Sequence, residues 1–211
     1  FLAPAYLGYT CGSQGWCQQM KANGVTKMRN WGRYAGNRYK DFPNIVWLNG
    51  GDCKASNYGA ADVVDAVAEG IREVDTNHLH TAHCNRFNSA ADCYDKPWLD
   101  FNTTYADCYQ TPAELKIDYE RANRRPFVYI EGRYEAESDW TPRCIRSQAY
   151  WSLLGGAVGH VFGHGSIWGF FSGWKSAMET TGAHSMTHFE NLMLSRHWEL
   201  LVPDYSHTVL T

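Results

Sequence analysis

Two acidic residues follow apolar runs that have the composition of buried strands. Asp52 ends the stretch NIVWLNGGD at residues 44–52, and Glu131 follows the apolar part of RPFVYIEGRYE at residues 125–135. A carboxylate placed directly after a buried run is costly unless it is paired or takes part in chemistry. Two carboxylates that flank one bond are the arrangement of glycoside hydrolysis, in which one donates a proton and the other attacks carbon or activates water. The pattern therefore indicates glycosidase chemistry.

Each of these carboxylates also has a structural interpretation. Asp52 could cap the helix that follows it, as aspartates often do. Glu131 could be a buried partner of an arginine such as Arg29, Arg33 or Arg133. The sequence by itself leaves both alternatives open.

Other strand ends supply side chains that suit a sugar. Histidine and asparagine can hydrogen-bond to hydroxyl groups, and tyrosine or tryptophan can pack on the face of a sugar ring. The candidate substrate-binding residues are His83, Asn85, Tyr105, Arg133, Tyr134, His160, His164 and Trp168. A histidine at a strand end more often has a structural hydrogen bond, so no single member of this set identifies a site.

The elements that must position these residues alternate along the chain. Six apolar or β-rich runs are expected to be strands, at residues 2–8, 44–49, 78–84, 99–105, 126–131 and 157–163. Helical patterns are expected at residues 14–23, 25–41, 58–74, 112–123, 143–154 and 190–201. Strands that alternate with helices predict a parallel sheet, and runs that are apolar on both faces fit a sheet covered by helices.

This alternation predicts an α/β fold of the partial (β/α)8 TIM-barrel type, with one domain over residues 1–211 and about six of eight strands. The first residues read as a strand, which predicts two βα units upstream. A barrel with two open edges is expected to be unstable or inactive when expressed alone. A doubly wound open sheet is the alternative fold, although no glycine-rich phosphate-binding motif follows any run.

The composition of the chain argues against several classes of binding partner. The formal net charge is -3 and no basic run occurs, so nothing suggests nucleic acid. Residues 151–171 are apolar but contain His160, His164 and several glycines, which argues against a membrane span. No protein partner is evident, no cofactor is implied, and an aromatic content of 15% fits either a sugar-binding protein or a large core.

The seven cysteines suggest an oxidising compartment. Cys11 with Cys17 and Cys84 with Cys93 are the local bridges that the spacing allows, and the odd count leaves at least one thiol unpaired. Free buried cysteines are the alternative. No charged leader precedes the first residues, so there is no signal peptide in the sequence. The cysteines favour a secreted or periplasmic protein.

Four stretches of the sequence resemble the apiosidase-like glycoside hydrolase catalytic domain family. They are LAPAYLGY, GRYAGNRYKDFPNIVWLNGGD, PFVYIEGRYE and YWSLLGGAVGHVFGHGSIWGF, and the similarity covers nearly the whole chain. The resemblance implies a (β/α)8 barrel, an acid/base at Asp52 after the fourth barrel strand and a nucleophile at Glu131 after the seventh. It also implies cleavage of apiosyl linkages in a pectic polysaccharide with retention of configuration. A β-rich domain that often follows the barrel in this family is not part of the sequence.

Two other classes of protein compete with the glycosidase hypothesis. A metal-dependent barrel hydrolase would use histidines such as His78, His80 and His83, because HxH at a strand end can bind a metal. Here the HLH triplet precedes the strand end, so no metal ligands are assigned. The third possibility is a non-catalytic or truncated relative that binds carbohydrate.

Overall fold

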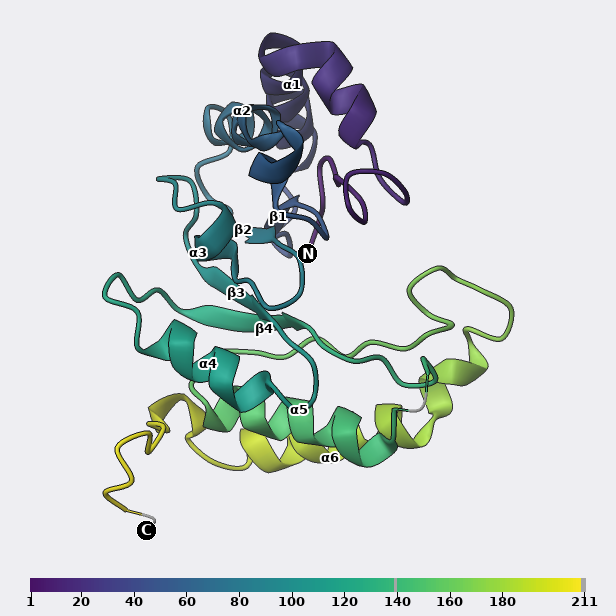
Figure 1. Ribbon diagram of the computed structural model, residues 1–211, viewed down its shortest axis with the longest axis vertical. Coiled ribbons are helices and arrows are strands. Elements are labelled where there is room, and N and C mark those ends of the chain that lie inside the picture. The colour runs from purple at the N-terminus through teal and green to yellow at the C-terminus, as the bar shows by residue number, and fades with distance from the viewer. Residues whose placement is uncertain (139, 210–211) are drawn as a thin grey trace. The chain divides into compact units, whose positions relative to one another are not determined.

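The computed structural model describes residues 1–138 and 140–209. The predicted domain at residues 1–211 thus includes Asp139, Leu210 and Thr211, which lie outside the described residues. The chain forms two compact units, Phe1–Thr103 and Thr104–Thr211. Strands and helices alternate along both, which confirms the α/β class (Figure 1).

The first unit is built on a parallel βαβ arrangement. Its elements are α1 (Cys17–Tyr39), β1 (Trp47–Gly50), a 3-10 helix (Ala55–Tyr58), α2 (Ala61–Arg72), β2 (His80–His83) and α3 (Ala90–Cys93). β1 and β2 pair in parallel, with Trp47 opposite His80 and Gly50 opposite His83. A parallel register requires a long crossover, and α2 supplies it.

Glycine divides the first helical region as the sequence predicts. Gly24 has φ of 72° inside α1, so two helical pieces meet there at a kink. The predicted segments at residues 14–23 and 25–41 correspond to these two pieces. Glycine is suited to this position because it adopts positive φ without the steric cost that a Cβ brings.

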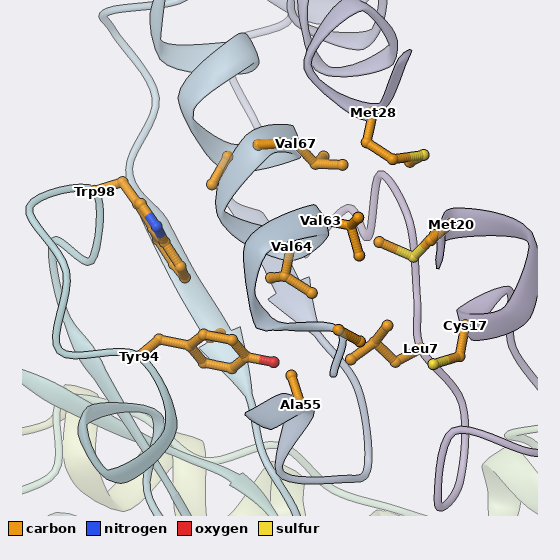
Figure 2. Packing of buried hydrophobic residues seen from close by; sticks show 14 of the residues in the cluster. Leu7, Cys17, Met20, Met28, Ala55, Val63, Val64, Val67, Tyr94 and Trp98 are labelled. Carbon is orange, nitrogen blue, oxygen red and sulfur yellow. The ribbon is translucent and has the colours of Figure 1, made fainter. Parts of the chain in front are cut away.

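The core of the first unit lies between the helices and the strands. Val63, Val64 and Val67 of α2 recur at helical spacing and are buried. Figure 2 shows this face of α2 between Met20 and Met28 on one side and Trp98 on the other. Burial of each such side chain contributes about 1.5–3 kcal/mol to folding.

The second unit repeats the alternation. β3 (Asn102–Tyr105) crosses the boundary between the units and forms a two-stranded sheet with β4 (Phe127–Glu131). The helices are α4 (Thr111–Tyr119), α5 (Pro142–Leu154) and α6 (Thr181–Leu194), with 3-10 helices at Ser176–Glu179 and Trp198–Leu200. Thr141 caps α5 by accepting the Cys144 N–H, which is the common helix-start pattern of threonine followed by proline.

Four of the six predicted strands are regular strands. The runs at residues 2–8 and 157–163 instead make isolated parallel bridges, from Leu2 to Trp47 and from Tyr129 to His160. The regular strands of the described residues form two separate two-stranded sheets, so no barrel closure is present among them. In the same part of the chain, no helix is long and apolar enough to cross a membrane.

The last predicted helix is wrong in its position. The helical pattern at residues 190–201 predicts a helix that begins late, whereas α6 begins at Thr181 and ends at Leu194. Its start is poor in helix-forming residues, but the buried Glu135 carboxylate accepts the Gly182 N–H at 2.8 Å and the Thr180 hydroxyl. A carboxylate at a helix N-terminus compensates the unpaired N–H groups there. That partner lies 47 residues away in the sequence.

Six of the seven cysteines form disulfides. The two local bridges, Cys11–Cys17 and Cys84–Cys93, agree with the sequence prediction. The third, Cys108–Cys144, joins the segment before α4 to the first turn of α5. Cys53 is the remaining thiol and is buried.

Candidate active site

Gly50 and Gly51 lead from β1 to Asp52. Neither glycine could be replaced by a larger residue without rearrangement of the neighbouring chain. Gly50 has φ of 83°, and a Cβ there would overlap the His83 carbonyl oxygen. A Cβ at Gly51 would overlap Leu7. The chain therefore turns out of the strand between two close backbone neighbours, and Asp52 comes directly after the turn.

Asp52 does not cap either of the helices that follow it. The 3-10 helix that begins at Ala55 has no side-chain cap, and neither does α2. Asp52 is half-buried, and its carbonyl oxygen accepts the Thr10 N–H at 3.2 Å. Its position at a strand exit is thus not explained by helix capping.

Two predicted sugar-binding residues lie in the same unit as Asp52. His83 is the last residue of β2, is buried and lies edge-on to Tyr6 with ring centroids 6.2 Å apart. The Gly51 N–H donates to the His83 carbonyl at 3.3 Å, so this histidine adjoins the Asp52 turn. Asn85 follows it and donates from its amide to the Arg86 carbonyl at 3.2 Å.

Glu131 is the last residue of β4 and is half-buried. The Tyr134 hydroxyl donates to Glu131 Oε1 at 2.8 Å. A hydroxyl that donates to a carboxylate both orients it and stabilises its charge. The Glu131 carbonyl accepts the Ala106 N–H at 3.3 Å, which places it beside the residue that follows Tyr105. The exits of β3 and β4 thus meet at Glu131.

The three arginines considered as partners of Glu131 form ion pairs with other carboxylates. Arg29 and Arg33 bind Glu73, the residue that directly follows α2. Arg133 binds Asp107, with Nη2 and Oδ2 3.2 Å apart. Glu131 is therefore not simply the acceptor for these three side chains.

Asp107 is a site residue that the sequence reasoning missed. Besides Arg133, it accepts the Tyr109 N–H at 3.2 Å and so holds the loop before α4. The signal was present, because Asp107 follows the exit of β3 just as Asp52 follows β1. A search for every acid after a strand would have found it.

His160 lies against the strand that carries Glu131. Its ring stacks on Tyr129 with centroids 5.6 Å apart and planes within 9°. Burial lowers the pKa of His160 to about 4, and its buried Nε2 has no hydrogen-bond partner among the described residues. This imidazole is therefore neutral at neutral pH. Tyr129 and Glu131 are two residues apart on one strand, so their side chains leave the same face.

The other two predicted residues of this segment have local contacts. His164 is buried, and its Nδ1 accepts the Ser166 N–H at 3.0 Å, which holds the turn that follows. Trp168 is 48% exposed and packs edge-on against Phe171, with ring centroids 5.0 Å apart. Their binding roles remain predictions.

The second unit thus brings Glu131 together with Tyr134, Tyr105 and the Arg133–Asp107 pair, while the first unit groups Asp52 with His83. Across residues 1–138 and 140–209, no group of three or more histidine, cysteine, aspartate or glutamate side chains could hold a metal ion. His78, one of the candidates for such a site, instead lies 2.8 Å from Asp75.

Comparison with solved structures identifies similar proteins. One is a glycoside hydrolase family 5 protein from Bacteroides vulgatus, with a TM-score of 0.77 and 26% identity over 85% of this chain and 47% of that one. Another, described as a glycoside hydrolase, has a TM-score of 0.72 and 26% identity over 82% of this chain and 47% of that one. The chain therefore spans about half the length of these structures. No curated protein sequence matches it.

The family model for the apiosidase-like catalytic domain matches residues 1–199. This match takes in every predicted site residue, from Asp52 to Trp168. The chain belongs to the apiosidase-like catalytic domain family of glycoside hydrolases.

Proposed function

We propose that this chain is the greater part of the catalytic domain of a retaining glycoside hydrolase, with Glu131 as nucleophile and Asp52 as acid/base. The observation that carries the proposal is the 2.8 Å hydrogen bond from the Tyr134 hydroxyl to Glu131 at the exit of β4. A nucleophilic carboxylate must be ionised and correctly oriented toward the substrate. This hydrogen bond favours the charged form and fixes the orientation of the group. In the proposed fold, the chain supplies about six strands of a (β/α)8 barrel, whose strand exits carry the active site.

The proposed reaction has two steps. Glu131 attacks the anomeric carbon while the Asp52 carboxylic acid protonates the departing oxygen, which yields a glycosyl ester on Glu131. Asp52, now a carboxylate, removes a proton from water, and that water displaces Glu131 from the sugar. Retention by this route requires the two carboxyl groups to be about 5–5.5 Å apart around the substrate.

The proposed substrate is a polysaccharide, and its apiosyl linkages are our specific proposal. Membership of the apiosidase-like family supports a carbohydrate substrate. A secreted or periplasmic location is proposed as well, because three disulfides are typical of proteins in oxidising compartments.

Substitution of the two carboxylates tests the mechanism. Glu131→Gln should reduce hydrolysis of every glycoside about a thousandfold or more, because glutamine cannot form the ester. Asp52→Asn should spare activated aryl glycosides, whose leaving groups need no proton, and should strongly slow natural linkages. Azide should restore turnover of aryl glycosides by Asp52→Gly and give glycosyl azides of retained configuration, because azide attacks the ester formed on Glu131.

Mass spectrometry gives the decisive measurement. A 2-fluoro glycoside should leave a sugar adduct on the peptide that contains Glu131 and on no peptide of Glu131→Gln. Equal loss of both substrate types in Asp52→Asn would contradict its acid role. Binding of glycans without turnover by the unaltered protein would identify a non-catalytic carbohydrate-binding relative instead.

A further inference from the structure

A groove with a volume of about 450 Å³ lies in the second unit, beside the segment that follows Glu131. Its lining consists of Tyr109, Arg133, Ser138, Trp140, Thr141 and Cys144. Arg133 comes two residues after Glu131, which is at most about 7 Å of backbone. The groove therefore opens within reach of a sugar unit next to one held at Glu131.

Aromatic rings form one part of this groove. Tyr109 is 77% exposed, and its ring lies 5.9 Å from that of Trp140 at an angle of 56°. An exposed aromatic ring presents a negative face, which attracts the positively polarised C–H groups of a sugar. A tyrosine so exposed contributes little to the hydrophobic core. Tyr109 is thus available as a platform for a ring-shaped ligand.

The polar part of the groove has a donor but little net charge. The Arg133 guanidinium lies over the Trp140 ring at 4.4 Å and is paired with Asp107. Its Nε is buried and has no hydrogen-bond partner among the described residues. A buried donor without a hydrogen bond is unfavourable, so a small shift of the Arg133 side chain toward a ligand oxygen would be favourable. Because Asp107 already balances the positive charge, a hydroxyl or ring oxygen suits this donor better than a carboxylate does.

A covalent link holds the two walls of the groove together. The disulfide joins Cys144, which lines the groove, to Cys108, the residue before Tyr109. Thr141 accepts the Cys144 N–H at 3.3 Å through its side-chain oxygen, which leaves its hydroxyl hydrogen able to donate to a ligand. A groove fixed in this way loses little entropy when a ligand binds.

We infer that this groove binds a neutral sugar unit of the substrate chain, adjacent to the bond cleaved at Glu131. Tyr109 is the stacking platform, and Arg133 and Thr141 are the hydrogen-bond donors. This inference rests on the proposed glycosidase function, but it is tested by binding rather than by turnover.

The experiment measures binding to the full chain by isothermal titration calorimetry. The Glu131→Gln background prevents turnover, and the probes are xylotetraose, arabinotetraose, galactotetraose and the acidic tetragalacturonate. At least one neutral probe should bind, and Tyr109→Ala should weaken it about 5- to 10-fold through loss of the stacking surface. Tyr109→Phe should retain binding, because the ring remains.

Tyr34→Ala is the matched control, because Tyr34 is an exposed tyrosine on α1 that does not line the groove. It should leave affinity unchanged. The inference is overturned if no neutral probe binds, if Tyr109→Ala binds as well as its parent, or if tetragalacturonate binds most tightly. If binding depends on Tyr109 but Glu131→Gln hydrolyses the substrate at the full rate, the groove would still be a sugar-binding site. Glu131 would then not be the nucleophile.

Discussion

At the scale of single residues, the proposed mechanism rests on the hydrogen bond from the Tyr134 hydroxyl to Glu131. The Tyr134 hydroxyl donates to one oxygen of the Glu131 carboxylate and so fixes the orientation of that group. Both side chains belong to one short stretch that begins in β4, and the Tyr134 ring also lies against the backbone at Gly163. Removing this hydrogen bond is therefore a direct test of Glu131 as the proposed nucleophile.

Tyr134→Phe should lower kcat about 10- to 100-fold, because the ring stays while the donated hydrogen bond to Glu131 is lost. KM for a small aryl glycoside should change much less than kcat. Steady-state kinetics measure both constants, and Tyr150→Phe on α5 is the matched control because its ring packs on Phe189. Equal kcat in Tyr134→Phe and the unaltered protein would show that the contact does not serve catalysis.

A second residue, Asp75, matters for stability rather than chemistry. Its side chain is fully buried and accepts hydrogen bonds from Trp47 Nε1 at 2.9 Å and from the Asn77 N–H at 3.1 Å, and it pairs with His78. Burial alone would raise the pKa of Asp75, but these hydrogen bonds outweigh burial and hold the pKa below its ordinary value. The carboxylate thus stabilises the fold in its charged form.

Asp75→Asn should lower the free energy of unfolding by about 1–3 kcal/mol at pH 7, because buried donors lose a charged acceptor. A depressed pKa gives stability that is present above the unfolded-state value and is lost as the pH falls through the folded-state value. The difference between the two proteins should therefore shrink below about pH 4. Urea unfolding at pH 7, 5 and 3 measures it, and a difference that grows toward acid pH would contradict this assignment.

At the scale of elements, the contact between α1 and α2 depends on glycines. A Cβ on Gly32 of α1 would overlap the Val67 carbonyl oxygen, and one on Gly70 of α2 would overlap the Arg29 carbonyl oxygen. The helices are therefore closer than larger residues allow. Arg29 and Arg33 of α1 also bind Glu73, the C-cap residue of α2, at the exposed edge of this contact.

Gly32→Ala should destabilise the protein by about 1–3 kcal/mol, although alanine is the better helix former by about 1 kcal/mol. The added methyl group forces the two helix backbones apart. Thermal unfolding of Gly32→Ala and Gly12→Ala makes the comparison, since a Cβ at Gly12 meets no atom closer than 3.8 Å. A more stable Gly32→Ala would mean that helix propensity outweighs the close contact.

Side chains also take part in joining strands. The Thr81 hydroxyl of β2 donates to the Phe101 carbonyl at 2.8 Å, and the Thr103 hydroxyl of β3 donates to the Ala82 carbonyl at 2.6 Å. These bonds run between strands that have no regular backbone ladder. Hydroxyl groups here satisfy carbonyls that a ladder would otherwise pair.

At the scale of the whole molecule, the three disulfides differ in the length of chain that they close. Cys11–Cys17 spans 6 residues, Cys84–Cys93 spans 9, and Cys108–Cys144 spans 36. In the chain-entropy account, closing a longer loop removes more freedom from the unfolded state. The long bridge should therefore contribute most to stability.

Replacing Cys108 and Cys144 together by serine should lower the free energy of unfolding by about 4 kcal/mol, against about 2 kcal/mol for the pair Cys11 and Cys17. Urea unfolding of the two double variants measures the difference. Similar losses in both would show that loop entropy does not set the contribution of these bridges.

The sequence alone determined the features that depend on near neighbours in the chain. The division of α1 at Gly24, the apolar face of α2, the two short disulfides and the placement of Asp52 and Glu131 after strands all follow from local pattern. Each of them is set by backbone preference, residue spacing or alternation of apolar and polar side chains. For the same reason, the family resemblance was readable from a few continuous stretches.

Only the tertiary structure decided the features whose causes lie far apart in sequence. Helix α6 begins at Thr181 because Glu135 reaches its first turn, and Arg133 pairs with Asp107, which lies 26 residues earlier in the sequence. The runs at residues 2–8 and 157–163 remain single bridges rather than strands. In each case a long-range partner, or the lack of regular pairing with one, outweighs local propensity, and no spacing rule in a single sequence identifies such a partner.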